Sequence, residues 1–210
     1  MAQRTIKLYS DYKSPYAYLA KDLVYDLERE TGALIDWLPY TLDIPAYLGS
    51  AKVDAHGNVV EETRNAHQWR RVKYSYMDCR REANRRGLTI RGPRKIFDSS
   101  RANIGMLYAK RHGLLRGYHD RVFERFWKRE LDIESSDALA AVLRECGAGT
   151  EDFAAFLEGD GRRQLQDIRR EAEAAGVFGV PSFLLEDGDL YWGREHLPRI
   201  RELLMSAPTT

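Results

Sequence analysis

The hydrophobic and polar positions of the first forty residues follow two different periods. Residues 5–9 alternate and are rich in β-forming side chains, which predicts a strand. A helical period begins at Ser14, a favoured N-cap residue, and Pro15, a favoured first helical residue. Gly32 ends this helix, and residues 33–40 predict a second strand. The β-α-β order predicts a parallel strand pair joined by a right-handed crossover.

The middle of the chain is mainly helical in its pattern. Residues 43–63 contain Pro45, Gly49 and a polar run at 54–58, so we expect them to be rich in loops. Apolar residues then recur at helical spacing up to about residue 175, interrupted by glycines. The predicted helices are Thr63–Arg86, Arg101–His112, Tyr118–Arg129, Ser136–Cys146 and Gly161–Ala175.

The pattern returns to strands near the end of the chain. Residues 182–186 and 190–192 read as two strands around Asp187-Gly188, a hairpin turn signal. A closing helix is predicted over residues 195–205. The predicted order is therefore β-α-β, a helical block, and β-β-α.

Composition and charge exclude several classes of protein. The 210 residues are 43% hydrophobic, and 33 basic against 32 acidic residues give a net charge of +1, which argues against a globally basic nucleic-acid binder. Two cysteines, Cys79 and Cys146, are too few for a disulfide scaffold, and the five histidines lack zinc-ligand spacing, so no metal is expected. No apolar segment predicts a signal peptide or a membrane span, which favours a cytoplasmic protein without a membrane partner.

Positive charge is concentrated in one part of the predicted helical block. Residues 64–101 hold twelve Lys or Arg and only three Asp or Glu. A solvated helix face with ion pairs is the first interpretation, steering of an anionic small molecule into a cleft is the second, and nucleic-acid binding is a distant third. No nucleic-acid partner is therefore expected.

Three short motifs could carry chemistry. Ser14 either caps its helix or donates its hydroxyl to an anion, such as a thiolate, at the helix N-terminus. The Val180–Pro181 bond is either an ordinary loop proline or a cis peptide that leaves the Val180 N–H and C=O free to pair with an extended peptide. Glu195 follows the last strand and either complements a helix dipole or binds a ligand.

Together these motifs predict an α/β thioredoxin fold with a large all-helical insertion. Residues 1–42 and 176–210 form the thioredoxin-like domain, and residues 43–175 form the inserted helical domain with its connecting loop. A thiol-disulfide oxidoreductase of this fold needs Cys-x-x-Cys at the first helix, whereas residues 14–17 here are Ser-Pro-Tyr-Ala. The two cysteines lie in helical patterns of the insertion, and a structural role is expected for both.

The chain resembles the 2-hydroxychromene-2-carboxylate isomerases and kappa-class glutathione transferases, a DsbA-like group. Residues 11–20 match the pattern D-x-x-S-P-Y-x-Y-L-A, and residues 176–183 match G-V-F-G-V-P-S-F in full. The W-G-x-D-R-L pattern appears at residues 192–197 with Glu195 in place of aspartate and His196 in place of arginine. The resemblance spans essentially the whole chain and implies the same fold, together with a homodimer.

The resemblance also implies a function that depends on glutathione as cofactor. Its thiolate would add to a conjugated, ring-opened aromatic acid from aromatic degradation, and rotation followed by elimination would complete a cis-trans isomerisation. Ser14 is the expected catalytic residue. The expected glutathione-binding residues are Ser14, Val180, Trp192, Gly193, Arg194 and Glu195, and the expected substrate-binding residues are Arg64, Asn65, Phe97 and Arg101.

Two other functions stay open at this point. A kappa-type transferase would conjugate glutathione to an electrophilic substrate, and the sequence does not choose between conjugation and isomerisation. A non-catalytic ligand-binding protein with a thioredoxin fold would use the same cleft without glutathione.

Overall fold

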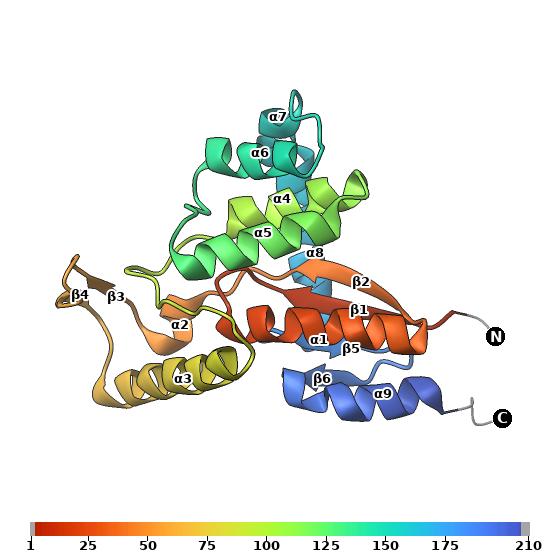
Figure 1. The fold of residues 1–210 in the computed structure, drawn as a ribbon, viewed down its shortest axis with the longest axis horizontal. Coiled ribbons are helices and arrows are strands. Elements are labelled where there is room, and N and C mark those ends of the chain that lie inside the picture. Colours follow the sequence, from red (N-terminus) through yellow and green to blue (C-terminus); the bar gives the residue numbers. More distant parts are fainter. Residues whose placement is uncertain (1–2, 207–210) are drawn as a thin grey trace.

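The computed structural model describes residues 3–206, and its centre is a mixed sheet with strand order β2-β1-β5-β6 (Figure 1). Strand β1 (Thr5–Ser10) runs parallel to β2 (Leu34–Pro39) and antiparallel to β5 (Ser182–Leu184). Strand β6 (Leu190–Trp192) continues the sheet as the antiparallel partner of β5. The predicted thioredoxin topology is confirmed. Of the predicted thioredoxin-like domain, residues 1–2 and 207–210 lie outside the described residues.

Helix α1 (Pro15–Thr31) lies between β1 and β2 in the chain and begins and ends as the sequence predicts. The Ser14 side chain accepts a hydrogen bond from the Ala17 N–H, and Gly32 ends the helix with a left-handed φ of 67°. The closing helix is divided into a short 3₁₀ turn, η1 (Arg194–His196), and α9 (Leu197–Met205). Helices α1 and α9 pack beside each other along the sheet (Figure 1).

The insertion between β2 and β5 is mostly helical. The predicted helices are present with ends that differ by three residues or fewer, and a short additional helix, α7, lies between the last two of them. Helix α4 packs against β2, which joins the insertion to the sheet. The helices are α3 (Ala66–Arg85), α4 (Ser100–Arg111), α5 (Leu115–Lys128), α6 (Ser136–Glu145), α7 (Phe153–Glu158) and α8 (Asp160–Ala174).

Residues 43–63, which are expected to be rich in loops, also contain regular elements that the sequence does not predict. They form a short helix, α2 (Ile44–Leu48), and a hairpin of β3 (Ala51–Val53) and β4 (Val59–Glu62), which projects at the left of Figure 1. The Asp54 carboxylate stabilises the turn by accepting hydrogen bonds from the backbone of residues 56 and 58. All four residues of β4 are exposed, so the sequence has no alternation between apolar and polar positions that would predict this strand.

Aromatic side chains from both parts of the chain share one core. Tyr12, two residues before the α1 cap, meets Tyr118 edge-on at a centroid distance of 5.8 Å. Tyr18 on α1 stacks against Phe123 on α5 at 5.6 Å. This shared packing fixes the start of α1 against the insertion, where the cleft described next opens. Among residues 3–206, every helix is too short or too polar to cross a membrane.

Candidate functional site

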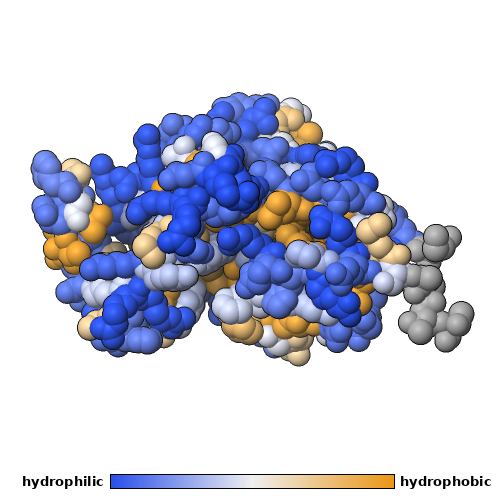
Figure 2. All heavy atoms as spheres, turned by 60° about the horizontal axis from the view of Figure 1, so that its bottom comes forward, coloured by the Kyte–Doolittle hydropathy of each residue, from blue (hydrophilic) through white to orange (hydrophobic). Residues whose placement is uncertain are grey.

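A large cleft lies where the N-terminal end of α1 faces α3, the hairpin and the loops around residues 93–97 and 178–181. Its volume is about 1560 Å³, which exceeds the roughly 300–1,000 Å³ of an ordinary small-molecule site. The surface in Figure 2 is mainly hydrophilic, with one apolar patch at the left over the hairpin and others in the right half of the molecule. Val59 and Val60, on β4, belong to the exposed apolar residues of the hairpin. The volume suits two ligands bound together.

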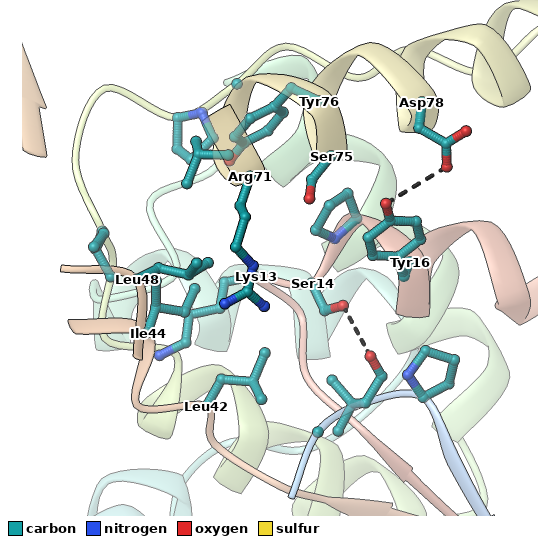
Figure 3. A pocket seen from close by; sticks show the side chains of 18 of the residues that line it. Lys13, Ser14, Tyr16, Leu42, Ile44, Leu48, Arg71, Ser75, Tyr76 and Asp78 are labelled. Carbon is teal, nitrogen blue, oxygen red and sulfur yellow. Dashed lines mark hydrogen bonds between the residues drawn. The ribbon is translucent and has the colours of Figure 1, made fainter. Parts of the chain in front are cut away.

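Ser14 lies in the wall of this cleft and is 4% exposed (Figure 3). Its hydroxyl oxygen accepts from the Ala17 N–H at 3.2 Å, so the capping role expected as one alternative is present. The hydroxyl also donates to the Val180 carbonyl, but at 3.5 Å. Ordinary O–H···O bonds are about 2.7–2.8 Å long, so this hydrogen bond is weak. The Ser14 hydroxyl can therefore donate to a better acceptor when a ligand provides one. Capping and donation are therefore compatible.

The first turn of α1 has few free backbone donors. Pro15 has no N–H, and the N–H groups of Ala17 and Tyr18 both bond to Ser14. The Tyr16 N–H has no acceptor among residues 3–206. An anion placed at this helix end would therefore meet the Tyr16 N–H and the Ser14 hydroxyl, together with the positive end of the helix dipole.

The segment before β5 forms the opposite wall. The Val180–Pro181 bond is cis, which confirms the prediction from the sequence. The Val180 N–H has no acceptor among the described residues, whereas its carbonyl faces the Ser14 hydroxyl. The Val180 N–H is therefore unpaired within the described residues, as pairing with a peptide would need, while the C=O is already engaged by Ser14. Gly179 is required beside them, because a Cβ there would lie 2.7 Å from the Trp192 indole nitrogen.

The predicted 192–195 motif borders the same wall. Trp192 is half exposed and packs against Phe178 at a centroid distance of 5.0 Å. Gly193 has a φ of 107°, and the Glu195 carboxylate folds back over its Cα, where a Cβ would be 2.4 Å from the carboxylate oxygens. The Arg194 guanidinium lies over the Tyr16 ring at 5.6 Å. The segment thus contributes one basic and one acidic side chain to the lining of the cleft.

The four residues expected to bind substrate do not all meet at the cleft. Arg64 and Phe97 line it, as expected. Asn65 instead forms a capping box with Gln68 at the start of α3, which fully explains an asparagine at this position. Arg101 donates to the Glu134 carbonyl at 3.0 Å and does not line the cleft. The structure therefore brings Arg64 and Phe97 together at the cleft and leaves Asn65 and Arg101 outside its lining, because a sequence pattern does not specify which way a helix end faces.

Lys13 is a functional candidate that the sequence analysis missed. It lines the cleft beside Ser14 although it is only 7% exposed, and its ammonium lies 3.9 Å from the Asp11 carboxylate. The Phe97 carbonyl accepts its one hydrogen bond, at 3.3 Å, so two of its three donors are unused by residues 3–206. Burial raises the pKa of Asp11, and the neighbouring Lys13 opposes that shift. A lysine directly before the N-cap serine was the available signal.

Arg71 is the second missed residue. It extends from α3 into the cleft towards the side where Ser14 and Leu42 lie (Figure 3). It forms no hydrogen bond or ion pair with any residue that the structure describes. Ten basic side chains line the cleft against three acidic ones, Asp78, Glu82 and Glu195. The basic segment therefore contributes to an electropositive cleft, as the anion-steering interpretation requires.

Neither cysteine supplies a reactive thiolate to this cleft. Burial raises the pKa of Cys79 to about 12, and burial also raises the pKa of Cys146. At neutral pH both side chains are thiols, in agreement with the structural role expected for them. The fold and site therefore define a thioredoxin-fold protein without a dithiol, in which the first helix presents a serine to an electropositive cleft.

Comparison with known proteins agrees with this class. The family model described as DSBA-like thioredoxin domain matches residues 5–205, so the chain belongs to that family. Two relatives are named 2-hydroxychromene-2-carboxylate isomerase. The protein from Sphingobium xenophagum is 27% identical over 96% of this chain and 98% of its own length. The protein from Pseudomonas putida is 29% identical over 91% of this chain and 90% of its own.

Solved structures show the same fold. A 2-hydroxychromene-2-carboxylate isomerase structure superposes with a TM-score of 0.72 at 24% identity, covering 95% of this chain and 94% of the other. The cytosolic disulfide reductase DsbM from Pseudomonas aeruginosa with GSH gives 0.65 at 20% identity, covering 95% and 96%. The resemblance to the isomerases is thereby confirmed, and relatives with this name support an enzyme with isomerase function.

Proposed function

We propose that this protein is a glutathione-dependent isomerase of the 2-hydroxychromene-2-carboxylate isomerase type, acting on a conjugated aromatic acid. The observation that carries the proposal is the position of Ser14, whose weakly held hydroxyl stands at the N-terminus of α1 in an electropositive cleft. The names of the sequence relatives support the reaction class. A structural neighbour solved with GSH supports the choice of thiol.

The residues around Ser14 fit the groups of glutathione. The unpartnered Val180 N–H is a donor for the backbone of a cysteinyl residue, as in the pairing of an added strand. At the rim, the Glu195 carboxylate can accept from the γ-glutamyl ammonium, and the Arg194 guanidinium can donate to the γ-glutamyl carboxylate. Trp192 and Phe178 give this end of the site an aromatic edge. In this proposal the peptide binds with its sulfur towards Ser14.

Glutathione, when bound, would supply a thiolate whose reversible addition to a conjugated double bond permits rotation about that bond. Ser14 and the Tyr16 N–H donate to the negatively charged sulfur and thus favour it over the thiol. Lys13 adds a buried positive charge on the same side, where screening by water is weak. Arg71 binds the carboxylate of the substrate from the facing side of the cleft, and its planar fork suits two carboxylate oxygens.

Two measurements test this function. Calorimetric titration with reduced glutathione should give saturable binding, and 2-hydroxychromene-2-carboxylate should isomerise only when glutathione is present. Glutathione should be recovered unchanged, because an isomerase returns it at every turnover. Stoichiometric loss of the free thiol would instead identify a transferase. Absence of both heat and thermal stabilisation at millimolar glutathione would contradict the proposal and favour a ligand-binding protein.

A further inference from the structure

A second group of basic residues lines the cleft around Tyr76, about one to two helical turns further along α3 than Arg71. The Arg80 guanidinium is 5.6 Å from the centre of the Tyr76 ring. Arg129, at the end of α5, donates to the Gly92 carbonyl, and a Cβ on Gly92 would lie 3.4 Å from an Arg80 nitrogen. Arg94 lines the cleft beside Gly92. Arginines from three segments thus converge on one place.

These arginines lack the acidic partners that other arginines of α3 possess. Arg81 pairs with Asp78 at 3.8 Å, and Arg85 pairs with Glu82 at 2.8 Å. Within residues 3–206, Arg80, Arg94 and Arg129 form no ion pair, and the hydrogen bonds of Arg80 and Arg129 go to backbone carbonyls. Burial lowers the pKa of Arg129, and the neighbouring guanidinium groups of Arg94, Arg91 and Arg80 lower it further. Like charges are thus held together without compensation.

The backbone at Arg129 adds an independent observation. Among residues 3–206, Arg129 is the only residue other than glycine with a left-handed backbone, and its φ is 62°. Glycine or asparagine usually occupies this position after a helix, because a side chain makes the conformation unfavourable. An arginine is therefore held here at a conformational cost, and its guanidinium is directed to Gly92 at the edge of the cleft. The left-handed conformation and the bonds to Gly92 together hold the guanidinium at the cleft, where it can take part in ligand binding.

We infer that Arg80, Arg94 and Arg129 form a second anion subsite, which receives a doubly charged oxyanion group, such as a phosphoryl group, on the substrate. Several guanidinium groups can donate together to the oxygens of one dianion, and the dianion relieves their mutual repulsion. The subsite is part of the same cleft as Ser14 but comprises other residues than the proposed glutathione wall. The inference rests on the proposed function and requires a substrate that carries this dianionic group in addition to the carboxylate assigned to Arg71, so 2-hydroxychromene-2-carboxylate would occupy the Arg71 side of the cleft and leave the second subsite empty.

Calorimetric titration with inorganic phosphate and pyrophosphate, at constant ionic strength, tests the subsite directly. Arg80→Gln should weaken the binding of these probes about tenfold, the effect of losing one charge-assisted interaction. Arg70→Gln is the matched control, because Arg70 lies on the same helix but outside the cleft and the substitution removes the same charge. It should leave phosphate binding unchanged. Acetate, with a single charge, should bind much more weakly than phosphate.

A second variant separates binding from folding. Arg129→Gly supplies the residue that a left-handed φ favours, so the folded state should keep its stability while phosphate binding falls about tenfold. Equal weakening by Arg70→Gln and Arg80→Gln, or acetate binding as tight as phosphate binding, would overturn the subsite. Glutathione titration of the same variants distinguishes the two proposals, because loss of the phosphate subsite leaves glutathione affinity intact and a failed glutathione site leaves phosphate binding intact.

Discussion

Removal of the Ser14 hydroxyl should raise the pKa of the bound thiol more than it weakens glutathione binding. A free thiol has a pKa of about 8.5, so only about 3% is thiolate at neutral pH. The structure offers two donors to a sulfur at the end of α1, the Ser14 hydroxyl and the Tyr16 N–H. Ser14→Ala removes the first of them. Since a hydrogen bond to a charged group contributes about 1.5–3 kcal/mol, the bound pKa should rise by about one to two units.

The same variant also removes a helix cap, so stability must be measured separately. Loss of the bond from the Ala17 N–H should lower the free energy of unfolding by about 1 kcal/mol. Ser135 provides a matched control, because it caps α6 and accepts from the Ala138 N–H at 3.2 Å, the same distance as in the Ser14 cap. Ser135→Ala should cost similar stability and leave the thiol pKa unchanged, whereas Ser14→Thr retains both functions of the hydroxyl.

Thiolate absorbance of the bound glutathione, followed against pH, reports the first effect, and urea unfolding reports the second. Turnover of Ser14→Ala should be about ten- to hundredfold lower at neutral pH. The difference in turnover should shrink as the pH approaches the pKa of the free thiol. Near that pH the thiol in solution is already largely thiolate. If the thiol of bound glutathione has the same pKa in the wild type and in Ser14→Ala, the donor role is refuted. Ser14 then only caps its helix.

Three further predictions concern charged and titrating groups. Glu195→Gln should weaken glutathione binding only about fivefold, because the carboxylate is exposed. Glu202→Gln, on the outer face of α9, should leave the affinity unchanged, and equal affinities of the two variants would exclude the proposed contact. Burial lowers the pKa of His119 from 6.5 to about 3, so the unfolded chain binds the extra proton and about 4 kcal/mol of stability should be lost as pH falls between these values. Denaturant unfolding of His119→Gln should lack that part of the slope, and an unchanged slope would contradict the burial argument. Lys13→Met should raise the bound thiol pKa by about one unit, and adding Asp11→Asn should recover stability by removing the carboxylate left buried; an unchanged thiol pKa would remove Lys13 from the mechanism.

Local sequence signals predicted the strands whose residues alternate between burial and exposure, and the helix ends that have a capping residue. Residues 5–9 and 33–40 gave the strand pair, and Ser14 and Gly32 gave the limits of α1. The hairpin at residues 51–62 escaped prediction because most of its side chains are exposed, which leaves no period in the pattern. Its stability comes from local hydrogen bonds around the turn, and these have no hydrophobic signature.

The sequence predicted only those residues of the site that belong to a recognisable motif. Ser14 and Val180 are far apart in the chain, yet each has a motif of its own, and the structure brings them together. Lys13 precedes the N-cap serine, but its burial in the cleft depends on the contact of its ammonium with the Phe97 carbonyl, and a contact over that separation leaves no local signal. The basic segment was first expected to be a solvated face with ion pairs. That is true of Arg85, whereas Arg71 faces the cleft, because docking of α3 on α1 decides the face of each residue.

Ser14 is arranged to donate a proton in a hydrogen bond and not to attack as a nucleophile. A serine nucleophile needs a base that accepts its proton, and the partners of this hydroxyl are a backbone carbonyl and a backbone N–H. No histidine lines the cleft among the described residues, and His119 is buried with its ring bonded to Tyr12. The cations around Ser14 carry no lone pair for the task. The arrangement therefore agrees with the proposed function, in which a thiol from solution is the nucleophile and Ser14, Lys13 and the end of α1 would all stabilise its charged form.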